Sequence, residues 1–252
     1  MKVVIPSRGR SKRIKEQGLK IFPDAVVCVD EREMEDYARA GITNLLAHPS
    51  TEDSLTKIRN WIMLNVEDET IVQADDGIVA LYVMTNKNNA YIRNPDDIMQ
   101  VLLNAEAVAK GFGAHLFGFN QSADVKSYSP FEPFKLNAWV GSVVGMIGKT
   151  VKWDTFFRLR GDVDCSLQHI LTHRIILTDK RFHFLSEDRL KANGGNSHQR
   201  SKERDDNEKR MLKSKWGKYI HFGKRVGSSG GGIAMTSSID VKRRQWRMSK
   251  GD

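Results

Sequence analysis

The first half of the chain alternates short apolar runs with amphipathic segments, and this alternation restricts its fold more than any other feature. The expected strands and helices are, in order, residues 3–5, 11–18, 25–29, 31–40, 44–47, 54–65 and 70–74. Strands that alternate with helices in this way build a mostly parallel sheet whose faces are covered by helices. We therefore predict an α/β fold with a Rossmann-like, mostly parallel mixed sheet and helices on both faces.

The pattern continues less regularly beyond residue 77. We expect further strands and helices at residues 78–82, 95–111, 114–119, 138–147, 163–171, 174–177 and 182–185. After residue 190 come a polar loop containing glycines, a charged helix of about 15 residues and a glycine-rich linker at 227–232. These signals predict one α/β domain over residues 1–200 and a basic, helical and flexible extension over residues 201–252.

Positive charge is concentrated in the last quarter of the chain. The whole chain carries a net charge of +9, and from Lys191 onward there are 16 Lys and Arg residues against 6 Asp and Glu. Because phosphates release counterions when they are neutralised, a basic surface favours a nucleic acid as partner. The same composition also fits a solvated tail that keeps a protein soluble.

Aromatic residues are interleaved with this charge. Trp216, Tyr219 and Trp246 lie among lysines and arginines. Aromatic rings stack on unpaired bases while Lys and Arg hold phosphates, so the arrangement suits DNA or RNA. It equally suits a helix that packs Trp216 and Tyr219 onto the main domain.

Few features point to an oxidising or membrane setting. Cys28 and Cys165 are the two cysteines, so no disulfide framework is expected. No run reaches the ~18 apolar residues of a membrane span, and the first strand begins at residue 3, where a signal peptide would lie. We expect a soluble, cytoplasmic protein.

Two adjacent carboxylates, Asp75 and Asp76, end the apolar strand at 70–74 and precede Gly77. Carboxylates where a buried strand reaches the surface are costly unless a cation meets them, and a divalent metal that carries a sugar nucleotide is the usual candidate. We predict that Asp76 binds metal and that Asp75 contacts the ribose or a metal-bound water. Two caps on a surface turn are the alternative.

Three further features would lie near this strand end: the turn after the first strand, Asp30 and Arg59. The turn Pro6, Ser7, Arg8, Gly9 and Arg10 follows the first strand, at the sheet edge where open α/β sheets bind ligands, and its arginines suit a nucleotide diphosphate. Solvated arginines on a plain turn are the alternative reading of this segment.

Asp30 and Arg59 each allow two interpretations. Asp30 ends the second strand, where it would bind the base or ribose of a nucleotide or else cap the following helix. Arg59 lies on the helix before the carboxylate pair, where it would keep an aspartate ionised or else lie exposed on the surface.

Later in the chain, Asp162 and Asp164 stand at the start of a predicted helix, where the helix dipole alone would favour them. His198 follows a polar glycine loop. A neutral imidazole is a plausible ligand for manganese, although a histidine in such a loop is commonly exposed to solvent.

In their order, these motifs resemble the TET-associated glycosyltransferases, a group of GT-A fold proteins found largely in bacteriophages. The resemblance is carried over roughly residues 1–200 by the first strand with its Pro6–Arg10 turn, by Arg59, by Asp75 and Asp76, and by Asp162 and Asp164. Gly77 departs from the usual aspartate, any residue, aspartate pattern, which leaves open which carboxylate oxygen binds metal.

The resemblance implies a metal-dependent transfer of sugar from a nucleotide-sugar donor to a 5-hydroxymethylpyrimidine in DNA. It implies Asp162 as the base that deprotonates the acceptor hydroxyl, Asp164 as its support, and Asp76 and His198 as ligands of Mn²⁺ or Mg²⁺. A UDP-sugar is the expected donor. Two rival readings are a GT-A glycosyltransferase that acts on an acceptor other than DNA, and a nucleic-acid-binding protein whose site has degenerated.

Overall fold

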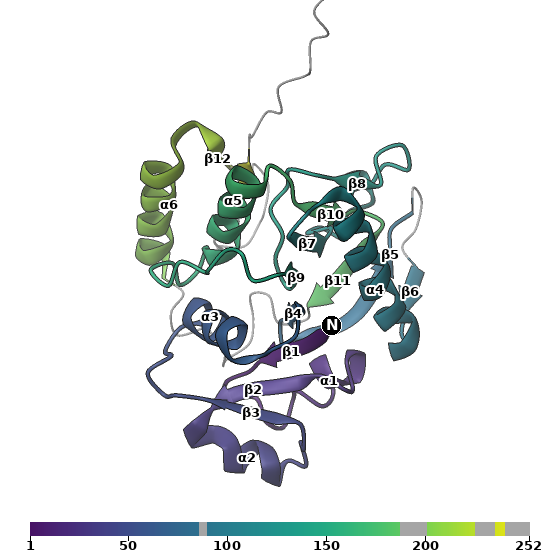
Figure 1. The fold of residues 1–252 in the computed structure, drawn as a ribbon, viewed down its shortest axis with the longest axis vertical. Helices are drawn as coiled ribbons and strands as arrows, with labels where there is room; N and C mark the ends of the chain where they lie inside the picture. The colour runs from purple at the N-terminus through teal and green to yellow at the C-terminus, as the bar shows by residue number, and fades with distance from the viewer. Residues whose placement is uncertain (86–89, 187–200, 225–234, 240–252) are drawn as a thin grey trace, which may run out of the picture.

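The structure is a computed structural model that describes residues 1–85, 90–186, 201–224 and 235–239 (Figure 1). Its strands are β1 (Lys2–Pro6), β2 (Val26–Asp30), β3 (Leu45–His48), β4 (Thr70–Ala74), β5 (Ile78–Val83), β6 (Ala90–Ile92), β7 (Leu116–Phe119), β8 (Phe134–Lys135), β9 (Val143–Ile147), β10 (Leu177–Asp179), β11 (Phe182–Ser186), β12 (Ile220–Lys224) and β13 (Met235–Ile239). Its helices are α1 (Gly18–Ile21), α2 (Met34–Arg39), α3 (Leu55–Asn65), α4 (Pro95–Phe112), α5 (Gly161–His173) and α6 (Lys202–Trp216), with short 3-10 turns at Glu31–Glu33, Val125–Ser127 and Gly217–Tyr219.

The main sheet has the strand order β3-β2-β1-β4-β9-β7-β10-β8 among the described residues. β3, β2, β1 and β4 are mutually parallel, and β10 is parallel to β7. β9 runs antiparallel to both β4 and β7. The predicted mixed, mostly parallel sheet is therefore confirmed, and the start of β9 meets the end of β4 at one edge.

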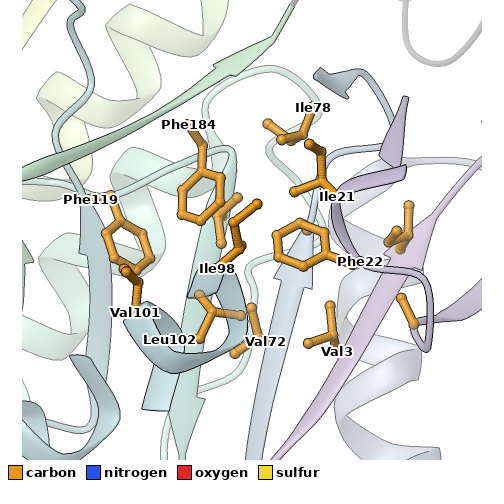
Figure 2. Close-up of a cluster of buried hydrophobic side chains, with 14 of the residues drawn as sticks. Val3, Ile21, Phe22, Val72, Ile78, Ile98, Val101, Leu102, Phe119 and Phe184 are labelled. Atoms are coloured by element: carbon orange, nitrogen blue, oxygen red, sulfur yellow. The ribbon is translucent and has the colours of Figure 1, made fainter. Parts of the chain in front are cut away.

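Helices cover both faces of this sheet because successive strand residues point to opposite sides. Val3 and Ile5 of β1 belong to a core cluster shared with α1 and α4, whereas Val4 belongs to a cluster shared with α3. Figure 2 shows the first cluster, in which Ile98 and Leu102 of α4 lie among side chains of the sheet. The expected two-faced α/β layering is confirmed.

Local capping residues set the ends of α4: the helix opens at Pro95 as predicted, but it continues past the expected end at Gly111 to Phe112. Asn94 accepts a hydrogen bond from the Asp96 amide, and Pro95 stands in the first turn. Gly113 ends the helix with φ of 70°, a left-handed conformation that favours glycine.

A third core cluster joins α5 and α6 to the sheet. Leu167 of α5, Leu212 of α6 and Ile220 of β12 are fully buried in it, together with Val144 of β9. Figure 1 shows α6 beside α5. The charged helix expected after residue 200 is present, and one of its faces is part of the core; the boundary at residue 200 between domain and extension stays a prediction.

Some predicted boundaries were wrong. Residues 11–17 form turns and not the expected helix, because the Gly18 amide bonds to the carbonyl of Asp76 at 3.2 Å and draws this segment onto the sheet. The strand predicted at 174–177 begins at Leu177, since Arg174 ends α5 in a left-handed conformation with φ of 69°. The linker predicted at 227–232 lies outside the described residues.

None of the helices in the described part of the chain has the length and apolar character needed to cross a membrane.

Candidate active site

The carboxylate pair lies where β4 leaves the sheet, and its two side chains have different partners. All five residues of β4 are buried. Asp76 is 8% exposed and accepts hydrogen bonds from Ser7 Oγ at 2.9 Å and from the Arg10 guanidinium at 2.6 Å. Burial raises the pKa of Asp76, and the Arg10 charge and the Ser7 hydrogen bond oppose that shift. Both oxygens of Asp76 are thus already bound within the protein.

Tyr37 of α2 reinforces this arrangement from the far side of the turn. Its side chain is 1% exposed, and its hydroxyl lies 2.8 Å from Ser7 Oγ. The same hydroxyl accepts a hydrogen bond from the Arg10 amide at 3.1 Å. The Pro6–Arg10 turn is therefore fixed to β4 and α2 before any ligand arrives.

Within this turn, Arg8 is the side chain that is available to bind an anion. Its side chain is half-buried and makes no hydrogen bond or ion pair with any residue that the structure describes. Gly9 beside it has φ of 65° and donates its amide to Glu33 Oε2 at 2.8 Å. Pro6 is buried in β1, so it contributes to the site through its backbone position.

Asp75 faces a second arginine and keeps part of its surface. Arg59 of α3 donates to Asp75 Oδ1 at 2.9 Å, and the guanidinium lies 4.8 Å from the centre of the Trp153 ring. Arg59 is 4% exposed, whereas the Asp75 side chain is 35% exposed. Asp75 Oδ2 accepts no hydrogen bond from the described residues. The predicted pairing of Arg59 with an aspartate is what the structure has.

Asp162 reaches the same place from α5. Its Oδ2 would lie 2.9 Å from a Cβ built on Gly141, so only glycine fits at position 141 without displacing the carboxylate. Burial raises the pKa of Asp162; the Arg59 and Arg160 charges oppose this and the Asp75 charge adds to it. Asp162, Asp75 and Arg59 are therefore electrostatic neighbours, although they are far apart in the sequence.

The segment that leads into β9 contacts Asp75 through Ser142 and lies beside Asp162 at Gly141. Ser142 has φ of 61° and its carbonyl accepts the Asp75 amide at 2.7 Å. A left-handed conformation is strained for a serine. This contact could not be predicted from the sequence, because a main-chain hydrogen bond does not depend on a recognisable side chain.

Asp164 has a different environment from Asp162. It is fully buried and accepts hydrogen bonds from Trp216 Nε1 at 2.7 Å, from Gln168 Nε2 at 2.7 Å and from the Lys215 ammonium at 2.9 Å. The structure therefore places Asp164 as a link between α5 and α6. Trp216 packs onto the main domain, which is the second of the two readings of the interleaved aromatics.

Glu208 of α6 completes this link at the start of α5. It is 4% exposed and accepts the successive main-chain amides of Arg158, Leu159 and Arg160 at 3.0 Å each. Asp205, one turn earlier, accepts from Arg160 Nε at 2.8 Å. These carboxylates hold the three residues before Gly161, and so fix the first turn of α5 that carries Asp162. Sequence reasoning missed both residues.

Asp30 is placed as a cap. Its carboxylate accepts from the Arg32 amide at 3.0 Å, from the Arg32 guanidinium at 2.9 and 2.6 Å, and from Ser50 Oγ at 2.7 Å. These hydrogen bonds, Arg32 first, hold the pKa of Asp30 well below its usual range. Of the two interpretations of Asp30, capping is the one whose contacts are present.

The residues offer a partial fit to a divalent cation. In the part of the chain that the structure describes, no three His, Cys, Asp or Glu side chains are grouped to hold a metal. His198 lies outside the described residues. Asp75 nevertheless has one carboxylate oxygen that accepts no hydrogen bond from the described part of the chain, and Mg²⁺ or Mn²⁺ commonly needs only one or two protein carboxylates beside the oxygens of a diphosphate. Each oxygen of Asp76 already accepts a hydrogen bond, so a metal bound there would share that oxygen with Ser7 or Arg10.

Several solved structures resemble the fold. S. aureus TarS 1–349 in complex with UDP-GlcNAc is 15% identical, with 80% of this chain and 62% of that chain covered and a TM-score of 0.49. A CMP:2-keto-3-deoxy-manno-octonic acid synthetase complexed with CTP is 9% identical, with coverages of 85% and 98% and a TM-score of 0.45. A UDP-glucose pyrophosphorylase complexed with UDP-glucose is 8% identical, with coverages of 73% and 91% and a TM-score of 0.44. The chain thus spans about three fifths of the TarS 1–349 chain.

No curated protein matches the sequence. A family model does match it, the TET-associated glycosyltransferase model, over residues 1–195. The matched segment contains the β1 turn, the carboxylate pair after β4, Arg59 and the start of α5 with Asp162. The resemblance expected from those motifs is confirmed, and the chain belongs to the TET-associated glycosyltransferase family.

Proposed function

We propose that the protein transfers a sugar from a nucleotide-sugar donor, a UDP-sugar in the first instance, to the hydroxyl group of a 5-hydroxymethylpyrimidine in DNA. Family membership supports the reaction class. The observation that carries the proposal is the position of Asp162, a half-buried carboxylate at the first turn of α5 with Asp75 and Arg59 as its electrostatic neighbours. This transfer requires a general base beside the donor site.

The donor would lie over the ends of β1 and β4, where open α/β sheets bind nucleotides. Arg8 would contact the diphosphate, because it has no partner of its own among the described side chains. Asp75 would hold a divalent cation together with diphosphate oxygens, and its exposed oxygen supports that role. When bound, such a cation would neutralise charge on the leaving diphosphate.

At the acceptor, Asp162 acts as general base. It removes the proton of the hydroxymethyl group while the hydroxyl oxygen forms a bond to the anomeric carbon of the sugar. The bond from that carbon to the diphosphate oxygen breaks, and the nucleoside diphosphate leaves with the electron pair. A raised pKa makes a carboxylate a better proton acceptor near neutral pH, so the burial of Asp162 suits this role.

Arg59 would serve both halves of the site. Its guanidinium donates to Asp75, and its charge lowers the pKa of Asp162. With Arg59 in place, the two carboxylates repel each other less and the ionised form of Asp162 is favoured. We therefore assign Arg59 a positioning role toward the two carboxylates, in line with the charge pairing that was one of its two interpretations from the sequence.

The DNA acceptor is supported by the family and by the charge of the C-terminal quarter. The test is mass spectrometry of nucleosides from hydroxymethylated DNA incubated with the protein, Mn²⁺ and a panel of nucleotide sugars. We expect a hexose-sized mass increase on the hydroxymethylated nucleoside alone. Unmodified DNA and the Asp162→Asn variant are the controls. Donor hydrolysis without labelled nucleoside would point to an acceptor other than DNA, and no turnover of any donor would support the reading of a degenerate binding protein.

A further inference from the structure

A cavity of about 300 Å³ lies between α6 and the loop that leads into α5. Its lining residues are Thr155, Phe156, Arg158, Arg204, Asn207, Glu208 and Met211. Pockets for small ligands begin at about this volume. One wall is the loop that continues through Gly161 into Asp162, so a ligand in the cavity would lie next to the segment that carries the proposed base.

The aromatic ring on this wall is unusually exposed. Phe156 is 70% exposed, although its neighbour Phe157 is 2% exposed. The loop holds its shape without Phe156, because the Phe156 amide bonds to Asp154 Oδ1 at 3.0 Å and Thr56 Oγ1 donates to the Phe157 carbonyl at 2.6 Å. The ring is therefore presented on a fixed backbone without packing into the core.

Positive charge lies beside that ring. Arg158 donates through one guanidinium nitrogen to Asp53 at 3.1 Å and remains 34% exposed. Arg204 enters from the first turns of α6. The carboxylate of Glu208, which forms part of the lining, is bound to three main-chain amides. Besides Thr155, Asn207 and Met211, a ligand would thus meet an aromatic face and two guanidiniums.

The α6 wall lies beyond residue 195, where the match to the family model ends. Glu208, Asp205 and Trp216 nevertheless attach α6 firmly to the start of α5. The cavity therefore combines a wall from the segment that the family shares with a wall from this chain's own C-terminal part.

We propose that this cavity is an acceptor subsite for nucleic acid, in which an unstacked base lies on Phe156 and its phosphate meets Arg158 and Arg204. A base has a π-face that stacks on an aromatic ring whatever its sequence, and guanidiniums bind phosphates in bidentate fashion. The inference rests on the proposed function and names the part of the molecule that holds the DNA flanking the acceptor base.

The test is the affinity of the full-length protein for a fluorescently labelled single-stranded oligodeoxynucleotide that contains 5-hydroxymethylcytosine, measured by anisotropy over a series of salt concentrations. Phe156→Ala is expected to weaken binding about 5- to 100-fold, the range found when a stacking aromatic is removed. Phe156→Tyr should retain most of the affinity. Arg204→Gln should reduce the slope of log affinity against log salt by about 0.7.

Phe131→Ala is the matched control, because Phe131 is 93% exposed and lies in the loop before β8, outside the residues that line the cavity. The subsite is overturned if Phe156→Ala binds as tightly as the wild type, or if Phe131→Ala weakens binding to the same extent. Near-UV circular dichroism of each variant shows whether it is folded. Hydrolysis of nucleotide sugars by the wild type is measured separately, so that absence of hydrolysis would count against the proposed function while the oligonucleotide comparison still decides the subsite.

Discussion

The Arg10 guanidinium and Asp76 Oδ1 are 2.6 Å apart, although 66 residues separate them in the chain. Both side chains are about nine-tenths buried, with exposed fractions of 10% and 11%. The contact ties the β1 turn to the end of β4. Of the two arginines in the predicted diphosphate-binding turn, Arg10 is thus bound within the protein, and Arg8 donates to none of the residues that the structure describes.

Substitution of Arg10 should therefore affect stability, whereas substitution of Arg8 should affect nucleotide-sugar binding. Arg10→Gln leaves a buried carboxylate without its cation, and we expect it to lower the free energy of unfolding by about 3 kcal/mol. Arg8→Gln should leave that free energy within about 0.5 kcal/mol of the wild type and weaken nucleotide-sugar binding instead. Urea unfolding and isothermal titration with UDP-sugars measure the two quantities. Equal loss of stability in both variants would contradict this division.

A divalent cation should matter for donor binding through Asp75. We expect nucleotide-sugar affinity to fall when Mn²⁺ is replaced by a chelator, and Asp75→Asn to abolish the difference between the two conditions. Asp76→Asn should chiefly lower stability, since it weakens the contact with Arg10. Titration calorimetry with and without Mn²⁺ decides this. A cation effect that survives in Asp75→Asn and disappears in Asp76→Asn would show that Asp76 is the ligand, as the sequence alone predicted.

Asp162→Asn should leave donor binding intact and lower the rate of transfer by about 10² to 10⁴, the usual cost of losing a general base. Because the base must be ionised and burial raises the pKa of Asp162, the wild-type rate should fall as pH decreases through a pKa above the ordinary aspartate value of about 3.9. The profile of kcat/KM against pH measures this limb. Near-normal transfer by Asp162→Asn would place the base elsewhere.

Glu208→Gln should disturb Asp162 from a distance. A glutamine has one acceptor oxygen for the three amides of residues 158–160, so the start of α5 should loosen. A displacement of about 1 Å at a reacting group can cost up to about 10² in rate. We expect kcat for transfer to fall with little change in the KM for the donor. Glu203→Gln, an exposed position in the first turn of the same helix, is the control and should behave as the wild type.

Asp30→Asn tests the capping role of Asp30. Removing the charge should cost about 0.5 to 2 kcal/mol at neutral pH. The pKa of Asp30 is lowered in the folded state, so its contribution to stability is fully present above the unfolded value of about 3.9 and is lost as pH falls through the folded value. The difference in unfolding free energy between wild type and variant should therefore shrink below about pH 4. A large loss of nucleotide affinity without loss of stability would instead favour a nucleotide-binding Asp30.

The parts of the site that were predictable from the sequence are those in which a local pattern fixes the position. The apolar run at 70–74 defines a buried strand, and the carboxylates that follow it must emerge at the sheet edge. Arg59 on the preceding helix was expected to reach one of them, and it does. Parallel strands bring their carboxyl ends to one edge, so order along the chain predicts proximity in space.

The rest of the site depends on contacts that leave no recognisable pattern in the sequence. Glu208 binds main-chain amides, which every residue has, so nothing in the sequence of residues 158–160 announces the contact. Asp164 resembles Asp162 in the sequence, but a helix turns about 100° per residue, so positions two apart face different surroundings. Asp164 meets Trp216 and Lys215 from a segment about fifty residues later. That pairing depends on how α6 packs, which the helical pattern alone does not specify.

The antiparallel insertion of β9 beside β4 has a consequence for how the protein is made. The carboxylate pair leaves the ribosome long before Ser142 and Asp162, the later neighbours of Asp75, and before the α6 residues that hold the start of α5. At about 5 to 20 residues per second, the interval between residue 76 and residue 220 is on the order of 10 s. The side chains that donate to Asp76, Ser7 and Arg10, both precede it in the chain, so these hydrogen bonds need no residue that is translated later. The β1 turn can thus supply the hydrogen bonds and the positive charge that Asp76 needs before the strands and helices that later pack beside β4 are translated.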